Sequence, residues 1–146
     1  MTYIGIDPGK SGALAIINGD EVKIFPFDKQ TYVEELLKVD ETDAICCLEK
    51  VHAMPKNGAV AMFTFGENFG WLQGILDAYK IPYDIVEPRK WKSEYTLNSD
   101  KQKSIDVAHR LFPNVSLRKT EKCRTDDDGM AESLLMALFA KRRLGR

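Results

Sequence analysis

The sequence predicts one α/β domain in which helices flank a sheet that has both hairpin-connected and buried strands. Three short strands separated by tight turns fill residues 1–27. The continuous apolar run Asp43–Glu49 is typical of a strand buried on both faces, and Pro82–Pro88 is expected to form a further strand. Segments with helical spacing of apolar residues follow these strands.

The individual elements follow from the turn and cap residues. Pro8-Gly9 ends the first strand, and Asn18-Gly19-Asp20 forms the turn after the second. The expected strands are Tyr3–Asp7, Ala13–Ile17, Glu21–Phe27, Asp43–Glu49 and Pro82–Pro88. The expected helices are Thr31–Val39, Ala59–Tyr79, Arg89–Tyr95, one from a capping box at Ser99-Asp100-Lys101-Gln102 to Phe112, and one from Asp127 or Asp128 to Leu144.

Composition places the chain among ordinary globular proteins. Its 146 residues suit one domain (1–146), and 44% hydrophobic with 29% charged residues is typical of a soluble fold. The three cysteines fit neither a disulfide framework nor a metal-binding spacing, which favours a reducing compartment. Neither a membrane-spanning run nor a secretion signal is present, so we expect a cytoplasmic protein without a membrane partner.

Charge is distributed unevenly along the chain. Residues 1–88 hold 7 Lys and Arg against 14 Asp and Glu, whereas residues 89–146 hold 14 against 8. A net charge of -1 therefore does not exclude a polyanionic partner, because a basic surface acts locally. The alternative explanation for the basic residues of the C-terminal half is that they lie on solvated helix faces and bind no partner.

Two predicted strands end in a carboxylate. Asp7 closes the first strand and Glu49 closes the buried run Asp43–Glu49. If these strands are adjacent, both acids lie at one edge of the sheet. For Asp7 the alternative is plain turn chemistry, since Asp before Pro-Gly is common in turns.

The last helix carries a second pair of acids. Asp128 and Glu132 are four residues apart, so they project from one helix face, where like charges repel unless a cation lies between them. Glu132 is surrounded by apolar residues and is expected to point inward. If Asp7, Glu49, Asp128 and Glu132 converge, they form an all-oxygen site that suits Mg²⁺ or Mn²⁺ rather than zinc. Two such ions can promote phosphodiester hydrolysis.

The helix Ala59–Tyr79 has glycines at every fourth position. Gly66, Gly70 and Gly74 lie on one face, which predicts close approach of a sheet or a partner helix. Its apolar residues are expected to supply core or interface surface, with the core favoured for most of them: Met62, Phe63, Phe69, Ile75 and Leu76.

Five motifs in order resemble RuvC-type Holliday junction resolvases, most of all the compact phage and organellar branch. They are I-G-I-D-P-G at residue 4, L-E-K-V at residue 48, the glycine-rich helix, P-R-K-W-K at residue 88 and D-D-G-M-A-E-S-L-L-M-A at residue 127. The resemblance spans Thr2 to Ala140.

The resemblance implies an RNase H-like fold with a mixed five-stranded sheet, three strands antiparallel and two parallel. It implies that Asp7, Glu49, Asp128 and Glu132 are the catalytic metal ligands, with two Mg²⁺ or Mn²⁺ ions in each active site. It further implies a homodimer, paired across the glycine-rich helix, that nicks two strands of a four-way DNA junction symmetrically in a bacterial or phage-infected cell or an organelle.

The chain departs from the family pattern at three places. Glu132 replaces a frequent Asp, and Gly129 stands where many members have a ligand, so the third ligand is assigned to Asp128 with Asp127 in reserve. His52 stands where some members have an aromatic wedge, so His52, Met54 or nearby residues are expected to open junction base pairs.

The basic C-terminal half supplies the expected DNA contacts. Each cation would neutralise a phosphate, and Lys119 or Lys122 could also stabilise charge at the cleaved phosphate. We expect contacts from Arg89, Lys90, Lys92, Arg118, Lys119, Lys122 and Arg124. Trp91 either stacks on DNA or belongs to the core, and the core is favoured.

Two other functions remain open at this point. One is a different RNase H-like nuclease that acts on flaps, branched DNA or RNA-DNA hybrid. The other is a junction-binding protein without catalysis, which the presence of all four acids disfavours.

Overall fold

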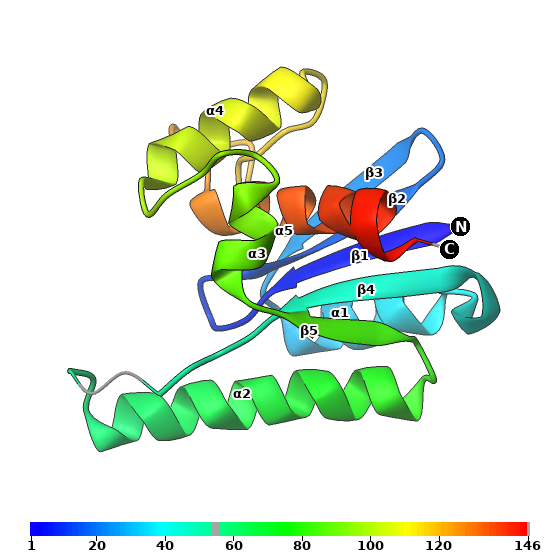
Figure 1. Cartoon of the computed structure of the whole chain (residues 1–146), viewed down its shortest axis with the longest axis vertical. Coiled ribbons are helices and arrows are strands. Elements are labelled where there is room, and N and C mark those ends of the chain that lie inside the picture. The colour runs from blue at the N-terminus through cyan, green and yellow to red at the C-terminus, as the bar shows by residue number, and fades with distance from the viewer. Residues whose placement is uncertain (54–55, 146) are drawn as a thin grey trace.

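The computed structural model describes residues 1–53 and 56–145, which form a five-stranded mixed sheet covered by helices on both faces (Figure 1). The strand order is β3-β2-β1-β4-β5. β1 to β3 form an antiparallel meander, and β4 and β5 run parallel to β1. The strands are β1 (Thr2–Asp7), β2 (Ala13–Asn18), β3 (Glu21–Pro26), β4 (Ala44–Glu49) and β5 (Tyr83–Val86). The predicted three antiparallel and two parallel strands are confirmed.

Each face of the sheet has its own hydrophobic cluster. One lies under α1 and α2, and the other lies under α3, α4 and α5 (Figure 1). The helices are α1 (Lys29–Leu37), α2 (Ala59–Ala78), α3 (Pro88–Ser93), α4 (Lys101–Leu111) and α5 (Asp128–Phe139), with a short 3-10 helix η1 (Glu41–Asp43) and a π-helical turn η2 (Ala140–Leu144).

Helix starts differ slightly from those predicted, because aspartates act as caps. Asp28 accepts a hydrogen bond from the Thr31 N–H, so α1 begins at Lys29. Asp100 caps α4 by accepting from the Gln102 N–H, so the predicted capping box that starts at Ser99 does not form.

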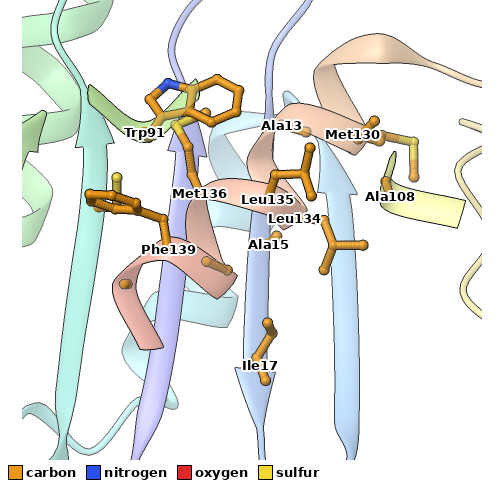
Figure 2. Packing of buried hydrophobic residues seen from close by; sticks show 14 of the residues in the cluster. Ala13, Ala15, Ile17, Trp91, Ala108, Met130, Leu134, Leu135, Met136 and Phe139 are labelled. Carbon is orange, nitrogen blue, oxygen red and sulfur yellow. The ribbon is translucent and has the colours of Figure 1, made fainter. Parts of the chain in front are cut away.

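The helix α5 packs directly on β1 because Gly5 has no side chain. A Cβ atom at Gly5 would lie 2.1 Å from the Ser133 carbonyl oxygen and 2.3 Å from the Ala137 nitrogen. Figure 2 shows Leu134 and Leu135 of α5 beside Ala13 and Ala15 of β2, whereas Phe139 of α5 lies nearer β1 and β4. This close packing fixes the height of α5 above the sheet.

The glycine face of α2 has no partner within the described part of the chain. A Cβ atom at Gly66, Gly70 or Gly74 would meet nothing within 4 Å. Phe63 is 72% exposed and so lies outside the core, whereas Ile75 and Leu76 of the same helix are buried. Among the described residues, no helix is both long and apolar enough to cross a membrane.

Candidate active site

The four predicted acids lie near one another at one edge of the sheet. β1 and β4 are parallel neighbours whose register pairs Ile6 with Leu48, so Asp7 and Glu49 are the next residues on their strands. The charges of Glu49, Glu132 and Asp128 all raise the pKa of Asp7, so these acids lie close to it. Strand ends and the first turns of α5 therefore contribute acids to a single region, as the sequence predicted.

Burial and mutual repulsion oppose ionisation of the strand acids. The pKa of Asp7 is well above its usual range because the carboxyl is buried and because Glu49 and Glu132 repel its charge. Burial also raises the pKa of Glu49. Neither Asp7 nor Glu49 forms an ion pair with any residue that the structure describes.

Lys101 faces the two helix acids. Its Nζ atom lies 3.3 Å from Glu132 Oε1 and 3.5 Å from Asp128 Oδ2. Burial alone would lower the pKa of Lys101, but the charges of Glu132, Asp128 and Asp7 outweigh it and raise this pKa. The side chain of Glu132 is 4% exposed, so Lys101 compensates a buried charge. No local sequence signal indicates this role of Lys101, which lies at the start of α4 and far from Glu132 in the sequence.

Trp91 positions Glu49. The indole Nε1–H donates a hydrogen bond of 2.7 Å to Glu49 Oε2. Trp91 is fully buried between α3 and the sheet, so the preference for a core role is confirmed. This hydrogen bond lowers the pKa of Glu49 and offsets part of the effect of its burial. The bond joins residues 42 positions apart, so no local sequence signal indicates it.

The three consecutive aspartates before α5 have separate roles. Asp126 lies 2.6 Å from His109 Nε2 and 4.0 Å from Arg118 Nε. Asp127 is the N-cap of α5: it accepts from the Met130 N–H and lies 3.6 Å from Lys119 Nζ. Asp128 faces Lys101, and its charge raises the pKa of Asp7. The geometry thus favours Asp128 over Asp127 as a member of the acid group.

The donor set suits a hard cation, but the side chains do not form a finished metal site. Within residues 1–53 and 56–145, no three His, Cys, Asp or Glu side chains are grouped closely enough to hold one ion. Lys101 instead supplies the positive charge next to Asp128 and Glu132. Carboxylate oxygens with unbalanced negative charge fit Mg²⁺ or Mn²⁺, and a bound cation would take over the role of the ammonium group.

A buried tyrosine adjoins Asp7 from the other face of the sheet. Tyr32 of α1 is 0% exposed, and its hydroxyl has no hydrogen-bond partner in the described part of the chain. Burial and the charge of Asp7 both raise the pKa of Tyr32. The Tyr32 hydroxyl therefore lies close enough to Asp7 for the charge of the carboxylate to affect it.

The predicted DNA-binding residues around α3 lie at different depths. Arg89 and Lys90 are exposed, and Lys92 is half-buried with its Nζ 5.7 Å from the Trp91 ring centroid. His52 Nε2 lies 2.7 Å from Glu87 Oε2, and Lys50 Nζ lies 3.3 Å from the other oxygen of the same carboxylate, Oε1. The prediction for Met54 falls outside the described residues.

The loop before α5 is basic and mostly exposed, as expected. Arg118 contacts Asp126 and Lys119 contacts the N-cap residue Asp127, whereas Lys122 and Arg124 form no ion pair with the residues described. The two contacting cations thus also anchor the loop to the start of α5.

Comparison with solved structures relates this architecture to a known fold. The chain matches Thermus thermophilus RuvC at a TM-score of 0.59 with 14% identity, covering 97% of this chain and 96% of that one. It also matches the structure described as "T. thermophilus RuvC in complex with Holliday junction substrate", at a TM-score of 0.60 with 15% identity and the same coverage. The chain has the RNase H-like fold of RuvC. No protein-family model and no curated sequence matches it.

Proposed function

We propose that this protein is a metal-dependent endonuclease that resolves four-way DNA junctions by paired, symmetric nicks. The observation that carries the proposal is the gathering of Asp7, Glu49, Asp128 and Glu132 at the strand-end edge of a RuvC-like fold. Four carboxylates whose charge is only partly balanced are unfavourable in a folded protein unless they serve a bound cation.

A pair of divalent ions, Mg²⁺ or Mn²⁺, would be held by Asp7, Glu49, Asp128 and Glu132. Such ions, when bound, activate the attacking water and stabilise the leaving oxygen in phosphodiester hydrolysis. The protein's own residues prepare the site. Trp91 orients Glu49, and Lys101 keeps Glu132 and Asp128 in place and offers a positive charge near the phosphate.

The exposed cations of the C-terminal half would bind the DNA backbone. Arg89 and Lys90 of α3 and Lys122 and Arg124 of the loop are free of ion pairs with the described residues, so they suit phosphate contacts. Lys92, Arg118 and Lys119 would join them after exchanging protein contacts for phosphate. His52 and Met54 would contact the branch point.

A homodimer would provide the two active sites that paired nicks require. The open glycine face of α2, with Val60 82% and Phe63 72% exposed, suits packing against the same helix of a second copy. Equilibrium sedimentation of the wild type and of Gly70→Leu tests this interface. A wild-type monomer bound to junction DNA would contradict the dimer.

A cleavage assay tests the substrate. Four-way junction, linear duplex, flap and RNA-DNA hybrid are compared with Mg²⁺ and with Mn²⁺. We expect symmetric nicks in the junction, whereas preferential cutting of duplex, flap or hybrid would favour the other RNase H-like activities. Junction binding without any cleavage would favour a non-catalytic binding protein.

A further inference from the structure

A cavity of ≈ 390 Å³ lies beside the loop that follows Asp7. It is bounded by this β1–β2 loop, by the segment between β3 and α1, and by the first half of α2. Its lining includes two aromatic rings, two cations and two neutral polar side chains: Phe27, Phe65, Lys10, Lys29, Thr64 and Asn68. It therefore lies next to the acid group but on the α1 and α2 side of the sheet.

The wall between the cavity and the acid group is held from both sides. On the cavity side, Asn68 Oδ1 accepts a 3.0 Å hydrogen bond from the Gly9 N–H. Gly9 has a φ of +105°, and a Cβ there would lie 3.2 Å from the Phe65 ring. On the α5 side, a Cβ at Gly129 would lie 2.3 Å from the Ser11 carbonyl oxygen. A ligand in the cavity would thus contact the β1–β2 loop, which is held in place on both sides and begins directly after Asp7.

The first half of α2 extends past the core with its inward face uncovered. Positions 61, 64, 65 and 68 continue the helix face that later buries Leu72, Ile75 and Leu76. Yet none of residues 59–67 is buried, and Phe65 is 39% exposed. Figure 1 shows this end of α2 reaching beyond the sheet on the side where β1 and β4 end. The cavity occupies the space under this overhang.

The lining combines features that recognise a nucleotide. A flat base can stack on an aromatic ring, and exposed ammonium groups attract a phosphate. Lys10 and Lys29 are both exposed, and Lys29 Nζ lies 5.2 Å from the Trp71 ring centroid. Glu67, which also borders the cavity, can accept hydrogen bonds from the amino group of a base. An anion alone would not need the rings, and an apolar ligand would not need the lysines.

We propose that this cavity receives an unpaired base of the DNA strand next to the cleavage position, with Phe65 and Phe27 against the base and Lys29 and Lys10 at its phosphates. The inference rests on the proposed function and adds a strand-positioning site outside the basic C-terminal half. The cavity faces away from the glycine face of α2, so a dimer formed through that face leaves it open.

Photocrosslinking tests the proposal without relying on cleavage. 5-Iodo-2′-deoxyuridine is placed at successive positions around the branch point of a four-way junction, bound to the full chain without divalent cation. After irradiation, the crosslinked peptides are identified by mass spectrometry. We expect one or two positions to crosslink to the peptide that holds Phe65 or Phe27.

Two variants examine the rings and the cations separately. Phe65→Leu keeps an apolar side chain but removes the stacking surface, and should lower the crosslink yield about tenfold. Lys29→Ala leaves the loop after Asp7 untouched and should also lower the yield. Lys38→Ala, at the other end of α1, is the matched control and should leave it unchanged. Circular dichroism confirms that each variant is folded.

The outcomes separate this inference from the proposed function. Crosslinks that map only outside the cavity, or that persist unchanged in both Phe65→Leu and Lys29→Ala, overturn the base-binding site alone. Failure of the wild type to bind the junction overturns the proposed function and this inference with it.

Discussion

Two groups of carboxylates near the start of α5 differ in how their charges are balanced. Asp126 and Asp127 contact His109, Arg118, Lys119 and a backbone N–H, so each has its own partners. Asp7 and Glu49 have no ion pair among the described residues, and their neighbours in the cluster share Lys101.

The difference separates a structural role from a functional one. Aspartates with local partners cap a helix and anchor a loop, which requires nothing from outside the protein. Asp7 and Glu49, whose pKa values are raised and which lack an ion-pair partner among the described residues, make the fold less stable unless a cation binds. Substitutions in the unbalanced group should therefore reduce cleavage strongly, whereas the same substitutions in the balanced group should change it little.

The largest effect is expected for Asp7→Asn. This change removes a proposed metal ligand and should reduce Mg²⁺-dependent junction cleavage at least about 10³-fold, while junction binding persists. Asp126→Asn is the matched change in the balanced group and should keep most of the activity. Single-turnover cleavage and binding assays measure both. Full activity of Asp7→Asn would remove Asp7 from the ligand set.

Asp127 and Asp128 are adjacent in the sequence but belong to different groups, so the same substitution should affect cleavage differently at the two positions. Asp128→Asn should lower cleavage about 100-fold, because it weakens a proposed ligand. Asp127→Asn should have little effect, since Asn caps a helix as well as Asp does. Cleavage rates of the two variants, with thermal unfolding as the control, decide between them. The reverse ranking would make Asp127 the ligand.

Trp91→Phe should have an intermediate effect. The ring still fills most of the core space, but Glu49 loses its 2.7 Å hydrogen bond. Loss of such an orienting partner typically costs about 10-fold or more in metal affinity or activity. The Mg²⁺ concentration that gives half-maximal cleavage measures the loss. An unchanged Mg²⁺ dependence would show that the indole N–H does not orient Glu49 for cation binding.

The smallest expected effect is on stability. Because the folded-state pKa values of Asp7 and Glu49 are raised, the folded protein holds these protons more tightly than the unfolded chain. Stability should therefore fall as the pH rises from the ordinary carboxyl range through the raised values. At neutral pH without metal, Asp7→Asn should unfold a few degrees above wild type, where 1 kcal/mol corresponds to about 2–5 °C.

Thermal unfolding between pH 5 and pH 8 measures this difference, since the other titrating groups are common to both proteins. Adding Mg²⁺ or Mn²⁺ should stabilise the wild type more than Asp7→Asn. Equal unfolding temperatures across this range would mean that the acid group carries no unbalanced charge.

The sheet and the acids were predictable because their signals are local. Turn residues and apolar runs locate the strands, and a carboxylate at the end of a strand is visible in the sequence. The prediction that Asp7 and Glu49 lie close together required one further assumption, that their strands are adjacent. The structure confirms this assumption. Glu132 stood out because it is an acid within an apolar helix face.

The supporting contacts were not predictable because they join distant segments. Lys101 reaches Glu132 across 31 positions, and Asn68 reaches Gly9 across 59. Helical spacing likewise could not separate core from interface for Phe63, because spacing does not reveal where α2 passes beyond the sheet. These features depend on how the elements stack rather than on any one of them.

The absence of a side chain at Gly5 sets the distance between the strand-borne and the helix-borne acids. A single added methyl group would push α5 away from β1 and carry Glu132 with it. In a scan of all substitutions, this position should therefore behave like an active-site residue although it touches no ligand. Inactive variants would arise there from a displaced helix, with every carboxylate still present.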